Sequence, residues 1–236
     1  MKFAIFDIDG TIFRSSLVIE LCLALVRKKV FPKKALDEIQ FEHTAWLNRQ
    51  GSYEAYINKV VKIYIKHIEG KSFSKVKKVA KQVISAQKDM TYRFTRGLIT
   101  KFKKQGYVLV AISGSPSYIV EEYAKVVGFD ECYGTELWVE KGKFTGRVKN
   151  LDPAFKKALV VKKLLNKYNN SDLKNSVAVG DTEGDTAMLK LVGRAIAFNP
   201  NMHLAKIARK NNWEVVVERK DVIYSFVSGG FLLLKE

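Results

Sequence analysis

Cysteine and histidine are scarce in this chain of 236 residues, which has two cysteines and three histidines. Two cysteines cannot build a disulfide framework, and neither Cys22 nor Cys132 is part of a metal-binding pair. The scarcity excludes the class of small disulfide-rich secreted domains and is typical of a protein from a reducing compartment. We therefore expect a cytoplasmic location.

Long apolar runs are also missing. The longest one, residues 17–26, is interrupted by Glu20 and falls short of the ~20 residues that a membrane-spanning helix needs. The first residues form a strand-like run without the basic leader and apolar centre of a signal peptide. The sequence thus predicts a protein without a membrane span.

Acidic residues are few relative to basic ones, with 24 Asp and Glu against 41 Lys and Arg and a net charge of +17. A field of this sign attracts phosphorylated ligands, nucleic acid or anionic lipid. The excess is spread along the chain, because residues 15–89 carry a net charge of +8 and the remainder carries +9. A solvated basic surface is the simpler interpretation, and the charge alone names no partner.

The hydrophobic pattern divides the chain into two parts. Residues 2–6 form a short apolar run typical of a buried strand, whereas residues 15–89 show apolar residues at the three- and four-residue spacing of helices. From residue 95 onward, strand-like and helix-like segments alternate, which predicts a parallel α/β sheet covered on both faces. We expect one discontinuous domain, residues 1–14 and 90–236, interrupted by a helical domain, residues 15–89.

Two local expectations refine this picture. Residues 135–148 are interpreted as a hairpin that turns at residues 140–143, where glycine follows a lysine. The apolar tail, residues 225–234, is interpreted as a single packed terminal strand.

Three of the predicted strands end in polar motifs. These are Asp7-Ile8-Asp9-Gly10-Thr11, Ser113-Gly114-Ser115 and Gly180-Asp181-Thr182-Glu183-Gly184-Asp185. Ligands of open parallel sheets bind at the carboxyl ends of the strands, so these motifs are expected to meet. Four aspartates in one crevice repel one another unless a cation is present, and Mg²⁺ is the cation that a few carboxylates and a phosphate commonly hold. No histidine lies in the motifs, which argues against zinc.

In order and spacing, these motifs resemble motifs I to IV of the haloacid dehalogenase (HAD) superfamily. The chain is most similar to the phosphoserine-phosphatase-like branch (subfamily IB), whose pattern the predicted hairpin at residues 135–148 also matches. The resemblance covers residues 1 to about 217. It implies a Rossmann-like HAD core, with residues 15–89 as an α-helical cap over the catalytic crevice.

The resemblance also implies roles for the motif residues. Asp7 would be the nucleophile that forms an aspartyl-phosphate, and Asp9 would protonate the leaving oxygen and then deprotonate the attacking water. Phosphate oxygens would be bound by the hydroxyls of Thr11 and Ser113 and the backbone N–H of Gly114.

The same resemblance implies a Mg²⁺ site and a charge-neutralising lysine. The metal would be held by Asp7, the backbone carbonyl of Asp9 and Asp181, with Asp185 as support. We choose Lys157 as the lysine from its distance in sequence to Asp181, with Lys156 as the alternative, because this stretch departs from the usual glycine-lysine pattern.

Each motif also has a simpler structural interpretation. The first could be an Asx-turn at a strand end, Ser113 a helix cap, and Asp185 an acid placed at a helix start by the helix dipole. Lys157 taken alone could be a solvated helix residue. Three aromatic residues at helical spacing in the cap are interpreted as packing: Trp46, Tyr53 and Tyr56.

The substrate is less defined by the sequence than the reaction. Phosphoserine phosphatases grip the substrate's amino group with a glutamate shortly after motif I, where this chain has Ser16, with Glu20 one helical turn later. We therefore expect a small phosphomonoester, and the cationic excess of the cap favours an acidic or multiply phosphorylated one. Candidate contacts are Arg14, Arg49 and Lys59.

The sequence thus predicts a Mg²⁺-dependent phosphatase that acts through an aspartyl-phosphate intermediate. A phosphomutase using the same intermediate is the alternative within this chemistry. A nucleic-acid-binding protein built on the same fold is a further alternative, suggested by the charge and unsupported by any recognition motif.

Overall fold

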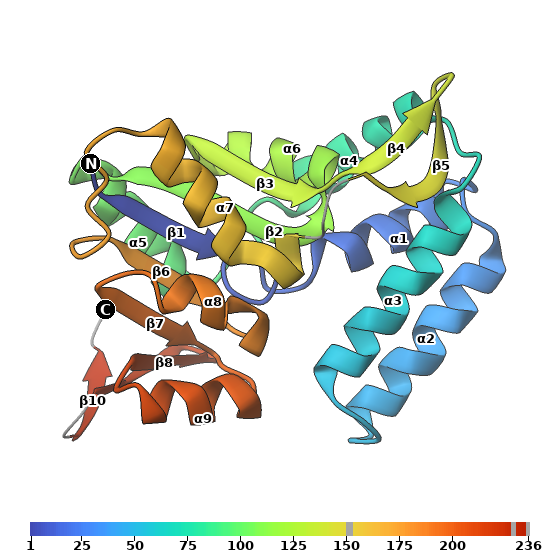
Figure 1. Cartoon of the computed structure of the whole chain (residues 1–236). Helices are drawn as coiled ribbons and strands as arrows, with labels where there is room; N and C mark the ends of the chain where they lie inside the picture. The colour runs from blue at the N-terminus through green and yellow to red at the C-terminus, as the bar shows by residue number, and fades with distance from the viewer. Residues whose placement is uncertain (150–152, 228–229, 235–236) are drawn as a thin grey trace.

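A computed structural model describes the backbone of residues 1–149, 153–227 and 230–234, and the side chains of residues 1–149 and 157–226. The described residues form a main sheet covered by helices on both faces, a two-stranded sheet, and a further group of helices that stands beside the main sheet (Figure 1). The main sheet has eight strands in the order β10-β9-β8-β7-β6-β1-β2-β3. The neighbouring pairs from β3 to β8 are parallel, and β9 and β10 are added antiparallel at one edge. The predicted parallel α/β fold is therefore confirmed.

The strands of this sheet are short. Their bounds are β1 Phe3–Asp7, β2 Val108–Pro116, β3 Glu131–Thr135, β6 Val177–Gly180, β7 Arg194–Phe198, β8 Glu214–Arg219, β9 Val222–Val227 and β10 Gly230–Leu234. The expectation of a single terminal strand is wrong, because the tail contributes both β9 and β10, with Phe231 opposite Phe226. Both runs are apolar, so the hydrophobic pattern alone does not reveal that the chain reverses between them.

Helices cover both faces of the sheet. On one face lie α7 (Pro153–Lys167), α8 (Thr186–Leu189) and α9 (Met202–Lys210), and on the other α5 (Arg93–Lys104) and α6 (Ser117–Val127) (Figure 1). Strand β1 is buried on both sides: Phe3 and Ile5 belong to the core under α7 to α9, whereas Ala4 and Phe6 belong to the opposite core. This explains why β1 reads as a continuous apolar run.

Four helices separate β1 from α5 and occupy the segment predicted to be the cap. They are α1 (Leu17–Arg27), α2 (Lys33–Leu47), α3 (Tyr53–Ile68) and α4 (Phe73–Gln87). The two chain crossings lie side by side, because the backbone N–H of Arg14 donates to Met90 (2.9 Å) and that of Tyr92 donates to Ile12 (3.0 Å). Helices α2 and α3 form an antiparallel pair that faces the arrowheads of the parallel strands (Figure 1).

The hairpin of β4 (Leu137–Glu140) and β5 (Lys143–Val148) fastens these helices to the core. Its turn places Lys141 and Gly142 at φ 48° and 75°, the left-handed conformation that a tight hairpin turn requires. Strand β5 exchanges backbone hydrogen bonds with the α3–α4 connection, Gly70 to Phe144 (2.8 Å) and Phe144 to Lys71 (3.0 Å). The hairpin therefore helps to fix where α3 and α4 lie.

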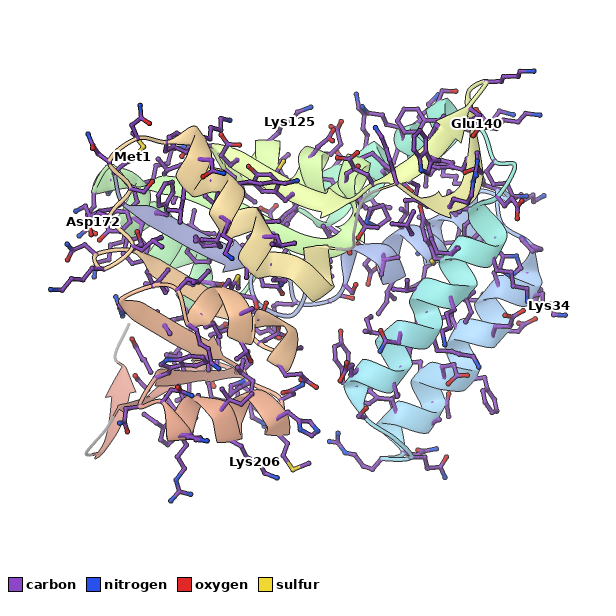
Figure 2. All side chains as sticks on the ribbon, viewed as in Figure 1. Met1, Lys34, Lys125, Glu140, Asp172 and Lys206 are labelled. Carbon is purple, nitrogen blue, oxygen red and sulfur yellow. The ribbon has the colours of Figure 1, made fainter. Side chains whose placement is uncertain are left out.

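The basic residues of the chain are distributed over several sides of the molecule. The labelled side chains of Lys34 on α2, Lys125 on α6 and Lys206 on α9 extend outward at three different edges (Figure 2), and all three are exposed. Within the described residues, no helix is both long and apolar enough to cross a bilayer.

Glu218 provides the missing cap of α5. Tyr92, the residue before this helix, makes no side-chain cap, and the Glu218 carboxylate from β8 accepts from the N–H groups of Arg93 (3.0 Å) and Phe94 (2.9 Å) instead. Because the carboxylate is almost buried and lies at the positive end of a helix, we expect Glu218→Ala to lower the free energy of unfolding by about 1–3 kcal/mol. Urea denaturation measures this.

The neighbouring Glu214 offers a matched control on the same strand. Its carboxylate pairs with the half-exposed Arg194 (2.9 Å), so Glu214→Ala is expected to cost less than about 1 kcal/mol. Equal losses for the two variants would contradict the capping role of Glu218.

Candidate active site

The sheet register brings the three polar motifs together. Asp7 at the end of β1 lies opposite Ile112 of β2, and Phe6 lies opposite Val179 of β6. The next residues along the two neighbouring strands include Ser113 and Asp181. The carboxyl ends of β1, β2 and β6 therefore meet, as expected for a ligand site of an open parallel sheet.

Three buried carboxylates form the centre of this site. One carboxylate oxygen each of Asp7, Asp181 and Asp185 lies within 4.8 Å of the others, and the three residues are 5%, 8% and 0% exposed. Lys157 of α7 reaches them with its ammonium, 2.5 Å from an oxygen of Asp7 and 2.5 Å from one of Asp185. The structure thus brings Lys157 into the cluster, whereas the side chain of Lys156 lies outside the described residues.

Asp185 is fixed by the turn that carries it. Its second oxygen accepts from the N–H groups of Asp181 and Thr182 (both 3.0 Å), in a capping box at the start of a 3₁₀ turn, Glu183–Asp185. A Cβ at Gly180 would lie 2.4 Å from the Asp185 carboxyl carbon, so only glycine permits this approach. Both carboxylate oxygens of Asp185 are therefore occupied, which makes it an orienting group for Lys157 and Asp181.

Gly10 plays the same part for Asp181. It has φ +78°, and an added Cβ would lie 2.2 Å from an Asp181 oxygen. The motif-I turn consequently needs glycine both for its left-handed backbone and for the close approach of the carboxylate.

The charge in the cluster is not balanced by the protein alone. Burial, and next the charges of Asp7 and Asp185, raise the pKa of Asp181 well above its usual range. Burial also raises the pKa of Asp7 to about 7, although Lys157 opposes this shift. Burial disfavours charge on Lys157, but Asp185 and Asp7 outweigh it and raise the pKa of its ammonium. With all three carboxylates ionised, one ammonium leaves two negative charges uncompensated, which is why the pKa values rise; a divalent cation would remove this deficit.

The cluster fits a hard divalent cation. All of its potential ligand atoms are carboxylate oxygens, which hard cations prefer. Within the described residues, no histidine or cysteine belongs to the cluster. The residues whose carboxylates could hold Mg²⁺ are Asp7, Asp181 and Asp185. Asp185 is the most constrained of the three, because its second oxygen also accepts from two backbone N–H groups.

Asp9 lies beside the cluster with its carboxylate turned toward the start of α1. One oxygen accepts from the N–H of Leu17 (2.5 Å), and the other accepts from the hydroxyls of Ser113 (2.5 Å) and Ser115 (3.0 Å). The serine motif therefore orients Asp9 in this structure. The Ser115 hydroxyl also accepts from the N–H of Val18 (3.1 Å) and so connects β2 to α1.

Thr11 and Gly114 lie nearby with partners of their own. The Thr11 hydroxyl donates to Asp181 (3.1 Å), with Asp7 at 3.4 Å, and its predicted contact with a phosphate stays a prediction. The carbonyl of Gly114 accepts from the hydroxyl of Thr135 (2.7 Å), which holds the motif-II turn against β3. In this structure Thr11 thus orients the carboxylates.

A cavity of about 620 Å³ extends from Asp181 to the helices α1 to α3. Asp181 and Gly10 lie at its catalytic end, and Arg14 and Glu20 also line it. Two further candidate contacts do not line it: Arg49 is exposed at the α2–α3 connection, and Lys59 faces Glu42 on the surface (3.5 Å). Ser16, where the related phosphatases have a glutamate, is buried at the start of α1.

Three residues near this site were not predicted. Ser115 belongs to the second polar motif, but no role was predicted for it. The signal was its spacing, because a residue two positions after Ser113 lies on the same face of the strand. Asn199 directly follows β7, the fourth parallel strand to end at this crevice. Its position after a predicted strand could have identified it from the sequence. Tyr92 has no such signal, because it comes to the cavity through the chain crossing beside Ile12.

A parallel sheet that gathers aspartates and a lysine at its carboxyl edge defines a class of α/β hydrolytic enzymes. A family model, described as haloacid dehalogenase-like hydrolase, matches residues 4–190, so the chain belongs to this family. The resemblance stated from the motifs is thereby confirmed.

Relatives of known name agree with the phosphoserine-phosphatase-like branch. A phosphoserine phosphatase of Methanocaldococcus jannaschii is 26% identical over 223 residues, which cover 94% of each chain. One of Archaeoglobus fulgidus is 36% identical over 112 residues, which are 47% of this chain but only 32% of that relative's length.

Solved structures support the fold. A protein of unknown function from Bordetella pertussis has a TM-score of 0.73 at 18% identity, covering 91% of this chain and 97% of its own. A phosphoserine phosphatase solved as a phospho-aspartyl intermediate analogue has a TM-score of 0.63 at 22% identity, covering 93% and 94%.

Proposed function

We propose that this protein is a Mg²⁺-dependent phosphatase that hydrolyses a phosphomonoester through an aspartyl-phosphate on Asp7. The observation that carries the proposal is the buried group of Asp7, Asp181, Asp185 and Lys157 at the carboxyl edge of the sheet. Family membership and the named relatives support it.

The first half of the reaction transfers the phosphoryl group to the protein. A carboxylate oxygen of Asp7 attacks phosphorus, and the bond from phosphorus to the leaving oxygen breaks with its electron pair remaining on that oxygen. Asp9 gives the leaving oxygen a proton, so the products are a free alcohol and the acyl phosphate of Asp7. The hydrogen bonds from Leu17 and Ser113 keep the Asp9 carboxyl beside Asp7 for this step.

The second half restores the enzyme. Asp9, now a carboxylate, takes a proton from water as the water oxygen attacks phosphorus, and the bond from phosphorus to the Asp7 oxygen breaks. Inorganic phosphate leaves and the Asp7 carboxylate is regenerated. Lys157 holds positive charge beside Asp7 throughout, where the phosphoryl oxygens would lie.

Mg²⁺ would be held by Asp7, Asp181 and the backbone carbonyl of Asp9, with Asp185 orienting Asp181 and Lys157. When bound, it supplies positive charge for the phosphoryl oxygens and cancels the deficit among the carboxylates.

Chelation of the metal tests the proposal. With Mg²⁺ present, the purified protein is expected to release phosphate from p-nitrophenyl phosphate or from members of a panel of phosphorylated metabolites. EDTA should lower that rate by about a hundredfold or more, and added Mg²⁺ should restore it. Phosphate release that is indifferent to EDTA would contradict the metal requirement, and no release from any compound would overturn the proposed function. An isomerised sugar phosphate in place of free phosphate would indicate the mutase.

A further inference from the structure

The part of the cavity that lies away from the carboxylates has a distinct chemistry. It is lined on the side of α2 and α3 by four rings, which we call the aromatic wall: His43, Trp46, Tyr53 and Tyr56. Aliphatic side chains of α1 and α2 also line it, among them Ile19, Leu23 and Ile39, together with the polar Glu20 and Gln40. The chamber that receives whatever is attached to the phosphate is therefore largely apolar.

The rings of the wall hold one another in place. Trp46 and Tyr56 are nearly parallel, with an interplanar angle of 9° and centroids 5.8 Å apart, and Tyr53 meets both edge-on at 5.3 and 6.0 Å. Such contacts limit the freedom of each ring, so a ligand ring would find a surface that is already ordered. The aromatic residues interpreted as packing do pack, but they also form the boundary of the cavity.

The wall reaches the catalytic end of the cavity. Tyr53 lines the same cavity as Asp181 and Gly10. In keeping with this position, burial and next the charges of Asp181 and Asp9 raise the pKa of the Tyr53 hydroxyl. A ligand that touches Tyr53 is thus close to the phosphoryl site, and its ring can extend toward Trp46.

The charged groups of the cavity do not favour an acidic ligand. Among the described residues that line it, Arg14 is the one permanent cation, and its guanidinium already lies 5.4 Å from the centre of the Tyr92 ring. The acidic Glu20 lines the same space and accepts from Ser15 (2.9 Å) and Gln87 (2.8 Å). The cationic excess of the cap lies elsewhere, for example at Lys59, which pairs with Glu42 on the surface.

We propose that this cavity binds the leaving group of the substrate, and that this group is a ring-bearing alcohol without acidic substituents. The inference rests on the proposed function for the reaction and adds the substrate class. A volume of about 620 Å³ is in the range of pockets that enclose drug-sized ligands and far exceeds what a serine side chain fills. A flat ring against Trp46 and Tyr53 uses this volume, whereas a small polar alcohol leaves the wall in contact with water.

The test compares two substrates with equally reactive phosphates, 3-phenylpropyl phosphate and propyl phosphate. The ring stands three carbons from the leaving oxygen in the first and is absent in the second, so a difference in kcat/KM reports binding of the ring. We expect kcat/KM to be about tenfold or more higher for the ring-bearing substrate. Equal values, or a preference for phosphoserine over both, would overturn the inference while leaving the phosphatase activity standing.

Variants of two tryptophans locate the effect. Trp46→Leu is expected to reduce the ratio of the two kcat/KM values by about tenfold. Trp138→Leu, in the hairpin outside the cavity, should leave the ratio unchanged. A ratio that is the same in Trp46→Leu and wild type would show that the ring binds elsewhere.

A binding measurement keeps the inference testable if no compound is hydrolysed. Calorimetry with the Asp7→Asn variant is expected to show 3-phenylpropyl phosphate binding about tenfold more tightly than propyl phosphate. If the protein hydrolyses nothing but still discriminates in this way, the proposed function fails and the ring-binding cavity stands. Equal affinities would refute the cavity assignment on its own.

Discussion

Asp7→Asn is expected to reduce phosphate release by about four to six orders of magnitude, because the amide cannot attack phosphorus to form the covalent intermediate. Asparagine has nearly the shape of aspartate, and Asp7 is 5% exposed at the end of a buried strand, so the surrounding packing should persist. Steady-state phosphate release with Mg²⁺ measures the loss, and thermal melting verifies that the variant is folded.

Asp37→Asn is the matched control for this substitution. Asp37 is exposed on α2 and does not line the cavity, so its amide variant should retain wild-type kcat and KM. Loss of a nucleophile reduces the rate far more than loss of an accessory group does. A folded Asp7→Asn protein that keeps about a tenth or more of the wild-type activity would therefore show that Asp7 is not the nucleophile.

The elements that the sequence predicts best are those bounded by residues with strong local preferences. Pro116 and Gly128 predict a helix over residues 117–127, and α6 has these bounds, with Gly128 at φ +87° as its C-cap. Strand β1 was predicted from its continuous apolar run, because a strand that is buried on both faces has apolar residues at every position. The tail was misread because two successive apolar strands give the pattern of one.

The candidate site follows the same division. The motifs around Asp7, Ser113 and Asp181 could be brought together from sequence because each follows a strand of one parallel sheet. Lys157 comes from a helix that has several lysines, and which of them faces the carboxylates depends on how α7 is rotated against the sheet. Spacing along the sequence contains no such information, so Lys156 could not be excluded on that basis.

The aromatic wall illustrates a different limit. Trp46 and Tyr56 have the helical spacing of core residues, and the structure does bury Tyr56 to 5% exposure. This spacing of apolar residues is the same whether the helix pair packs tightly on the sheet or leaves a cavity beside it. What decides between them is the tertiary placement of α2 and α3, which depends on the chain crossing near Arg14 and on the hairpin contact at Phe144.

Lys157→Met is the second substitution from which we expect a large effect, on stability as well as on activity. Lys157 is 4% exposed and its ammonium contacts both Asp7 and Asp185, so methionine would leave two buried carboxylates without a cation between them. Removing one partner of a buried ion pair costs about 3–5 kcal/mol, and we expect that loss in urea denaturation with EDTA present. Phosphate release should fall by about 10²- to 10³-fold, as when one group that stabilises transition-state charge is removed.

Asp181→Asn is expected to change the free energy of unfolding in the opposite direction to Lys157→Met. The substitution removes one of the three acidic groups, while Thr11 can still donate to the amide oxygen. In EDTA this variant should therefore be more stable than wild type by about 1–2 kcal/mol, which is a modest share of the Coulomb repulsion between close charges. Mg²⁺ should stabilise the wild type by about 2–3 kcal/mol at saturating concentration and stabilise Asp181→Asn much less, since ligand binding adds stability only to a state that binds it. Were both substitutions to destabilise the metal-free protein equally, the cluster would be held by packing, and the argument from unbalanced charge to a divalent cation would fail.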